Sequence, residues 1–452
     1  MTGLAVPSGL FAGVFARGKV ADEVSDRAVL QAMLDAELAL ARALAQVGLA
    51  PAGAADELER IGDASHYDVG AIGRSTGDKG TPVPGLLGQI RERLSDEAAG
   101  DVHKGATSQD IVDTALMLVA RRALGPLIAD LAAAAERCAR LAERQRATLA
   151  PGRTLLQQAL PLTFGLKAAG WLAGLDGAIA ELAEVRERGL AVQLGGAVGT
   201  LATYGERGLD VLTAFARNLD LPEPTIAWHT IRLRPARLAA ALGSALGIIG
   251  KVARDVVLLA QSEVAEAIEG GGEGRGGSST MPHKRNPVAA IGASACAARA
   301  PGLVATVLAA MVQEHERAAG AWQAEWEPLL ELLRLAGSGA VLLGESLAAL
   351  ELDPAKMRDD LGITGSLLMS ESVAGALASA LGRPAAQDLV ERAARRSVAQ
   401  RRSFREVLLE LPEVAEALGP DGLDEALDPQ RYLGATSQLI DRALRAHAGA
   451  GG

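Results

Sequence analysis

The stretch GGSSTMPHKRNPVAA, residues 276–290, connects two long segments of helical periodicity in the middle of the chain. These segments are residues 237–269 and 287–317, and each repeats apolar residues at helical spacing over more than about 25 residues. The glycine run EGGGEGRGG, residues 269–277, precedes the two serines and gives the backbone wide conformational freedom. The pattern predicts a flexible connection between two long helices.

Three further segments show helical periodicity over a similar length. They are residues 111–150, 161–189 and 326–350, and the chain as a whole is 49% hydrophobic with only 3% aromatic residues. The apolar residues are mostly Ala, Leu and Val, a mixture that favours helices over sheets. Long helices of this kind predict an antiparallel bundle. Their apolar positions spread around each helix, which predicts that the bundle associates with other copies of itself.

The sequence therefore predicts an all-α protein with three domains. Residues 1–110 are expected to form an N-terminal helical domain, in which Ser25 caps a helix that ends at Gly48. Residues 111–352 are expected to form the long-helix bundle with the glycine-rich loop. Residues 353–452 contain shorter, more charged segments and are expected to form a small C-terminal helical domain.

Composition excludes several classes of protein. The formal net charge is −10 without a basic tail, which argues against a nucleic acid or an anionic membrane as partner. We expect no signal peptide, because the sequence shows no basic N-terminal segment followed by an apolar run. We expect no membrane span, because it shows no uninterrupted apolar stretch of about 18 residues. We expect a cytoplasmic protein. The sequence contains no His-x-x-x-His or Cys-x-x-Cys spacing, so we expect no metal site and no cofactor.

The residues after the glycine run point to an anionic ligand. His283, Lys284 and Arg285 would repel one another unless an anion lies between them, and Ser278 and Ser279 add hydroxyl groups. A mobile front with a stiff cationic base suits a loop that closes over an anionic substrate. The alternative interpretation of the glycines alone is a solvated linker.

The segment GSSTMPHKRNP, residues 277–287, resembles the signature of the fumarase/aspartase superfamily. The resemblance implies that Ser278 is the catalytic serine and that Lys284 and Asn286 hold a substrate carboxylate. It also implies a homotetramer whose active sites are assembled from three separated segments of different subunits.

Two further segments carry the same resemblance. HKGATSQD, residues 103–110, is similar to the first superfamily segment, and hydroxyls and backbone N–H groups at a turn entering a helix can bind an anion. Thr107 and Ser108 are therefore predicted substrate-binding residues, although an ordinary helix N-cap is the alternative. GRTLLQQALPLTFG, residues 152–165, is similar to the second segment and predicts that Arg153, Thr154 and Gln157 bind substrate.

Position 155 departs from the superfamily pattern, because Leu155 replaces a histidine that serves several members as general acid. Superfamily reactions place negative charge beside a carboxylate, and an amine or hydroxide leaving group needs a proton. A carboxylate with a pKa of about 4 needs none. Leu155 therefore favours a branch in which a substrate carboxylate is the leaving group or, in reverse, the nucleophile.

The branch that fits is the 3-carboxy-cis,cis-muconate cycloisomerases, lactonising enzymes of protocatechuate catabolism. Residues 10–43, 102–115, 227–232 and 319–326 also resemble this branch. In AWHTIR, Arg232 matches a substrate-side arginine, but Leu233 stands where an orienting aspartate is expected. For His229 in the same segment, the alternative to a role in the site is a purely structural role.

The resemblance implies that one carboxylate of the substrate adds to an alkene carbon and gives an aci-carboxylate intermediate. Lys284 would stabilise this intermediate, and either Ser278 or His103 would deliver a proton to the α-carbon. Two other functions stay open. One is adenylosuccinate lyase or a related C–N lyase that releases fumarate; the other is a structural relative without activity.

Overall fold

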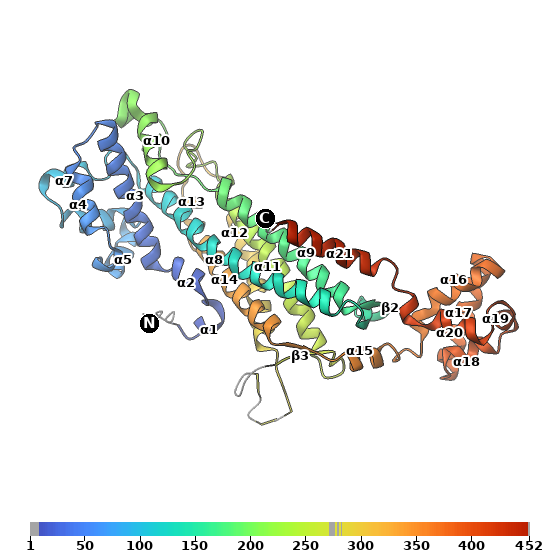
Figure 1. Ribbon diagram of the computed structural model, residues 1–452. Coiled ribbons are helices and arrows are strands. Elements are labelled where there is room, and N and C mark those ends of the chain that lie inside the picture. Colours follow the sequence, from blue (N-terminus) through green and yellow to red (C-terminus); the bar gives the residue numbers. More distant parts are fainter. Residues whose placement is uncertain (1–8, 271–275, 278–279, 282, 451–452) are drawn as a thin grey trace. The chain divides into compact units, whose positions relative to one another are not determined.

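The computed structural model describes residues 9–270, 276–277, 280–281 and 283–450. The described chain is mostly helical, as the sequence predicts, with two short two-stranded β-sheets (Figure 1). The N-terminal elements are α1 (Ala12–Phe15), α2 (Lys19–Glu23), α3 (Asp26–Val47), α4 (Gly53–Ile61), η1 (Ala64–His66), α5 (Val69–Lys79), α6 (Val83–Arg91) and α7 (Asp96–Asp101). The middle elements are α8 (Ser108–Arg144), β1 (Leu149–Thr154), β2 (Gln157–Thr163), α9 (Phe164–Glu184), η2 (Val185–Gly189), η3 (Ala202–Arg207), α10 (Gly208–Leu219), α11 (Leu233–Leu259), β3 (Ala267–Glu269), α12 (Val288–Ala309), α13 (Ala321–Ala324), α14 (Trp326–Ala348) and β4 (Leu350–Leu352). The C-terminal elements are α15 (Pro354–Asp360), η4 (Leu367–Met369), α16 (Ser370–Leu381), α17 (Arg383–Gln400), α18 (Phe404–Leu409), α19 (Pro412–Ala417), α20 (Gly419–Leu427), η5 (Pro429–Arg431) and α21 (Thr436–Ala450).

The helix α3 has the ends that its sequence predicts. The hydroxyl of Ser25 accepts a hydrogen bond from the backbone N–H of Ala28, and Gly48 ends the helix in the left-handed conformation. Its apolar stripe is buried, and α10 packs along it. The helix also buries one acid, Glu37, which is 1% exposed.

The five long segments of helical periodicity each contain a long helix, but several predicted ends are wrong, and α12 ends at Ala309 rather than at residue 317. Residues 149–150 and 161–163 lie in the antiparallel hairpin β1–β2, because Pro151 and Gly152 interrupt the helical backbone. Residues 267–269 form β3, which pairs with β4. The periodic pattern continued through these residues because a short half-buried strand and a helix end share similar apolar content.

The chain forms two compact units. The first comprises residues 1–132, 177–251 and 291–344, and the second comprises residues 133–176, 252–290 and 345–452, within the limits of the described residues. The helices α8, α9, α11, α12 and α14 each contain residues of both units, whereas α3 lies wholly in the first. The predicted division into three domains uses different boundaries and stays a prediction.

Within the first unit, α11, α12 and α14 approach one another closely at small residues. A Cβ atom at Gly250 would lie 2.6 Å from the side chain of Ala297, and one at Gly243 would lie 2.9 Å from Val304. Among the described helices, α12 alone is long and apolar enough to cross a membrane, and 33% of its most apolar window is buried. Helices in the core of soluble proteins have the same length and composition.

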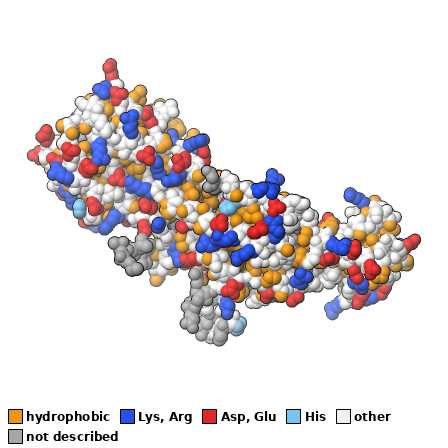
Figure 2. All heavy atoms as spheres, viewed as in Figure 1, with side chains coloured by type: hydrophobic (Ala, Val, Ile, Leu, Met, Phe, Trp, Pro, Cys, Tyr) orange, Lys and Arg blue, Asp and Glu red, His pale blue; other side chains and the backbone are white. Residues whose placement is uncertain are grey.

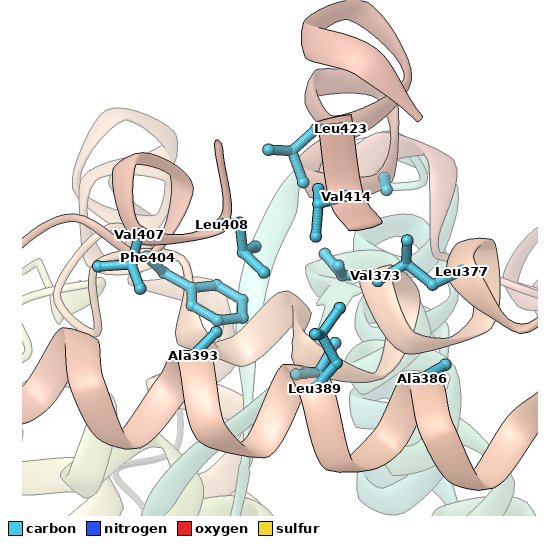
Figure 3. Packing of buried hydrophobic residues seen from close by; sticks show 12 residues of the cluster. Val373, Leu377, Ala386, Leu389, Ala393, Phe404, Val407, Leu408, Val414 and Leu423 are labelled. Carbon is cyan, nitrogen blue, oxygen red and sulfur yellow. The ribbon is translucent and has the colours of Figure 1, made fainter. Parts of the chain in front are cut away.

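Within the second unit, α16 to α20 enclose a core of their own. Phe404 on α18 lies against Ala393 and Leu389 of α17, and Val414 and Leu423 cover the opposite end of the cluster (Figure 3). The last helix, α21, is fixed by ion pairs from Arg146 to Asp441 and by His447, which contacts Asp176. On the face shown in Figure 2, acidic and basic side chains are mixed over the N-terminal helices.

Candidate active site

The predicted anion-binding turn lies at the start of α8. His103 and Gly105 both have positive φ, 62° and 77°, and a Cβ at Gly105 would lie 2.5 Å from the ring of Tyr204, so only glycine fits there. The Tyr204 hydroxyl donates to the carbonyl of Lys104 at 2.9 Å. The turn is therefore held from outside by a buried aromatic side chain.

Asp110 organises the backbone around this turn. Its fully buried carboxylate accepts hydrogen bonds from the N–H groups of Thr107, Gly195 and Gly196 at 2.9–3.0 Å. It also lies 2.7 Å from Nε2 of His229, which is 4% exposed. Because the described contacts of His229 are buried and internal, the geometry favours its structural role.

Arg232 lies in a buried ion-pair network with Asp113 and Glu325. Nη1 and Nη2 donate to the two oxygens of Asp113 at 2.7 and 2.9 Å, and Nε and Nη2 donate to Glu325 at 3.1 and 2.6 Å. The remaining Nη1 hydrogen points to the carbonyl of His229 at 3.5 Å, so all five N–H groups are directed at protein acceptors. The guanidinium also lies 4.9 Å from the ring of Trp228.

Electrostatics agree with this assignment. Burial lowers the pKa of Arg232, but the charges and hydrogen bonds of Asp113 and Glu325 outweigh burial, and the pKa is raised overall. Asp113 and Glu325 thus orient Arg232 in a chain that has Leu233 in place of the expected aspartate, and Leu233 is 51% exposed. This arrangement does not favour the predicted contact between Arg232 and a substrate carboxylate. We propose instead that Arg232 is a structural cation.

A second arginine, which the sequence did not indicate, lies directly on the turn. Nε of Arg317 donates to Oε1 of Gln109 at 2.7 Å, and Nη1 donates to Oγ1 of Thr107 at 2.7 Å. Both acceptors are neutral, and Nη2 has no hydrogen-bond partner among the described residues. Burial lowers the pKa of Arg317, opposed by the more distant charges of Asp110 and Asp113. A half-buried cation without a carboxylate partner is suited to bind an anion.

Gln109 connects the two arginines. Its Nε2 donates to Asp113 at 3.1 Å and to the carbonyl of His229 at 2.8 Å, while its oxygen faces Arg317. The amide orientation is thus fixed by its partners. The only sequence signal for Arg317 is its position two residues before the family-like segment 319–326, since no local motif includes it.

His103 is paired with the buried acid of α3. Its Nδ1 lies 2.7 Å from Oε1 of Glu37, and its side chain is 15% exposed. Burial lowers the pKa of His103, but the hydrogen bond and charge of Glu37, helped by the charge of Asp110, raise it overall. Glu37 lies 66 residues before His103 in the sequence, so no motif could have predicted the pair.

The predicted site residues of the second unit lie in the β1–β2 hairpin and in the signature loop. Arg153 on β1 binds both oxygens of Glu266, at 3.0 and 2.5 Å. Thr154 and Gln157 are exposed at the hairpin tip. Between them Leu155 is 97% exposed with φ of 50°, and Leu156 is 75% exposed with φ of 66°. Two exposed leucines in the left-handed region are unfavourable in an isolated chain.

The signature loop is described only in part. Ser278, the predicted catalytic serine, lies outside the described residues. Lys284 is exposed, and its N–H donates to the carbonyl of Met281 at 3.0 Å. Both N–H groups of Asn286, backbone and side chain, donate to the carbonyl of Gly276 at 2.9 and 3.0 Å. At its base, the carboxylate of Glu269 accepts from the first N–H groups of α12.

The structure thus links Thr107 and Arg232 in one network through Arg317, Gln109 and Asp113 in the first unit, and Ser108 and His103 belong to the same turn as Thr107. The predicted residues Arg153, Thr154, Gln157, Lys284 and Asn286 belong to the second unit. Their roles in binding or catalysis stay predictions.

Comparison with known proteins identifies the family of the chain. A family model described as "Lyase" matches residues 15–302, and one described as "Adenylosuccinate lyase C-terminus" matches residues 366–443. The chain belongs to the fumarase/aspartase superfamily of lyases. Within it, the chain is 46% identical to a 3-carboxy-cis,cis-muconate cycloisomerase of Bradyrhizobium diazoefficiens, over 93% of this chain and 94% of that protein.

Two other relatives extend the comparison. The crystal structure of the 3-carboxy-cis,cis-muconate lactonizing enzyme from Pseudomonas putida is 40% identical with a TM-score of 0.92, covering 98% of this chain and all of that one. A nitrosuccinate lyase of Streptomyces davaonensis is 42% identical over 97% of this chain and 95% of that protein. Enzymes of both kinds, cycloisomerase and lyase, therefore share this fold and length.

Proposed function

We propose that the chain is a cycloisomerase that converts 3-carboxy-cis,cis-muconate to 4-carboxymuconolactone in protocatechuate catabolism. The observation that carries this proposal is Arg317, a half-buried cation held on the Thr107 turn by neutral acceptors. Such a cation, with the hydroxyls of Thr107 and Ser108 beside the N-terminus of α8, suits a carboxylate ligand. Similarity over nearly the full length to cycloisomerases supports the same conclusion.

In the proposed reaction, one carboxylate oxygen of the substrate attacks the alkene carbon β to another carboxyl group. A C–O bond forms, and the π electrons move into the acceptor carboxylate to give an aci-carboxylate. Arg317 and Lys284 are the cations that stabilise this added negative charge. A proton then adds to the α-carbon, so three carboxylates become two and an ester, and one proton is consumed from solvent.

Leu155 is consistent with this chemistry. The position lies at the exposed tip of the β1–β2 hairpin, where several superfamily members carry the histidine that protonates a leaving group. Intramolecular addition of a carboxylate has no basic leaving group, and its reverse expels a weakly basic carboxylate. An apolar side chain can therefore occupy the tip without loss of this reaction.

An ultraviolet assay tests the proposal. Purified protein mixed with 3-carboxy-cis,cis-muconate should remove the conjugated-diene absorbance and give one lactone, identified by mass spectrometry and NMR, with no fumarate. Adenylosuccinate and nitrosuccinate serve as competing substrates. Fumarate released from either one, with the muconate left unchanged, would establish the lyase alternative and reject the cycloisomerase. A catalytically inactive relative would act on none of them.

We further propose a cytoplasmic homotetramer in which segments from different subunits complete each active site. An apolar groove of about 490 Å³ between α11 and α12 supports this proposal. It is lined by Ala240, Gly243, Ser244, Gly247, Ala297, Ala300, Pro301, Val304, Ala305 and Leu308. Small side chains along a groove of this kind allow another helix to approach closely, and most of the apolar window of α12 is not buried within one chain.

Gly247→Glu tests the tetramer. A Cβ at Gly247 meets no atom within 4 Å in the chain, so the substitution should leave the subunit folded while placing a charge in the groove. Light scattering after size exclusion should show a smaller species than the wild-type tetramer, with activity reduced at least tenfold. The control is Gly77→Glu on α5, where a Cβ also meets nothing. An unchanged assembly in both variants would place the interface elsewhere.

A further inference from the structure

We propose that Glu37 is a positioning residue that orients the imidazole of His103, and that His103 delivers the proton to the α-carbon. The proposal rests on the cycloisomerase function and deepens it, because it chooses between His103 and Ser278 as donor. It also adds Glu37, a residue of α3 that lies in the branch-like segment 10–43 but in none of the three segments 103–110, 152–165 and 277–287.

The geometry fixes which nitrogen of His103 contacts Glu37 and which is left for another partner. An ionised carboxylate can only accept, so Nδ1, at 2.7 Å from Oε1 of Glu37, carries a hydrogen. Nε2 has no hydrogen-bond partner among the described residues. The ring is therefore held by one nitrogen and presents the other. His103 and Thr107 belong to the same turn, in which the N–H of Ala106 donates to the carbonyl of His103 at 3.3 Å.

Burial and charge explain why the pair holds a proton. Glu37 is 1% exposed, and its second oxygen accepts no hydrogen bond from any described residue. A buried carboxylate needs a cation, and protonated His103 is the one in contact with it. Among the other charged neighbours, Asp110 raises and Arg91 lowers the pKa of His103, and Lys104 is paired with Asp101. Burial raises the pKa of Tyr204, so its hydroxyl stays neutral.

The proton balance is complete without another reactant. The Nε2–H bond of protonated His103 breaks as the C–H bond at the α-carbon forms, and the two electrons of the aci-carboxylate make that bond. His103 is left neutral with its Nδ1–H still on Glu37. Solvent then returns one proton to Nε2, which accounts for the single proton that lactonisation consumes.

Labelling with diethyl pyrocarbonate reads the protonation of His103 directly, because the reagent modifies only neutral imidazole. The tryptic peptide of residues 94–104 contains His103 as its one histidine, so mass spectrometry can follow it against pH. Glu37→Gln should move the labelling midpoint to lower pH. The matched control is Asp35→Asn, which removes the same charge from the same helix where Asp35 pairs with Arg122. Its labelling should match the wild type.

Kinetics then connect this change to the reaction. Because the donor must be protonated, kcat/KM should fall as pH rises through the pKa of His103, and Glu37→Gln should move this alkaline limb to lower pH. At pH 8 the variant should lose about tenfold or more in kcat, within the range of general acid catalysis. Glu37→Asp keeps the charge and should move both midpoints less than Glu37→Gln.

Three results separate the possibilities. Equal loss of activity at every pH, with the labelling midpoint unmoved, would make Glu37 merely structural and overturn the proposal. Full turnover by His103→Gln, with none by Ser278→Ala, would make Ser278 the donor. Since labelling needs no substrate, a shifted midpoint in a protein that does not lactonise muconate would support the pair and reject the proposed function instead.

Discussion

Replacing Arg317 with alanine should lower kcat/KM for 3-carboxy-cis,cis-muconate by about 100-fold or more, the usual cost of removing one donor to a developing oxyanion. The physical reason is that Arg317 is half buried and, among the described residues, donates hydrogen bonds only to neutral oxygens, so its charge is available to the substrate. If it stabilises the aci-carboxylate more than the ground state, kcat should fall together with kcat/KM. Steady-state kinetics at fixed pH measure both.

The same variant should remain folded, because burial of Arg317 costs desolvation energy and no carboxylate among the described residues pairs with it directly. We expect its midpoint of thermal unfolding to equal or exceed that of the wild type. Arg121→Ala is the matched control, since Arg121 is on α8 and pairs with the exposed Asp220. It should keep kcat/KM within a few-fold. A rise in KM alone for Arg317→Ala would limit the residue to ground-state binding and contradict its role in charge stabilisation.

Replacing Arg232 with methionine should lower the free energy of unfolding by about 3–5 kcal/mol, the cost of leaving buried charges without their partner. Asp113 and Glu325 are both buried, and each receives two or more hydrogen bonds from Arg232. Urea unfolding followed by circular dichroism measures the change. Arg207→Met removes an exposed ion pair with Asp210 and should cost less than about 1 kcal/mol.

The loss should also depend on pH. Burial already raises the pKa of Glu325 despite the opposing effect of Arg232. Without the arginine, the pKa of Glu325 in the folded variant should rise further above its unfolded value. The penalty therefore belongs to the charged form of Glu325, is largest at high pH and shrinks as pH falls and this group takes up a proton. A small loss that is the same at pH 5 and pH 8 would show that the network is not what holds Arg232, and would restore its predicted role at the substrate.

Local sequence was enough to predict the helices and the chemical type of the ligand. Apolar periodicity and the Ser25 and Gly48 caps located α3, because these signals act within a few residues of one another. Motif residues such as Thr107 and Lys284 indicated an anionic ligand for the same reason. Hydroxyl groups, cationic side chains and free N–H groups can be identified within a single short segment of sequence. Local signals failed at the β1–β2 hairpin, where pairing between strands, rather than periodicity, sets the conformation.

What the tertiary structure alone decided is which charges are already neutralised. The sequence pointed to Arg232 and not to Arg317 as a substrate cation, yet Arg232 has every N–H on a protein acceptor. Arg317 has no carboxylate partner among the described residues. Likewise, the sequence shows Glu37 only as an acidic residue on an apolar helix, and the fold places its carboxylate 2.7 Å from His103. Electrostatic energy depends on distance and burial, and residues 66 to 210 positions apart acquire both only when the chain folds.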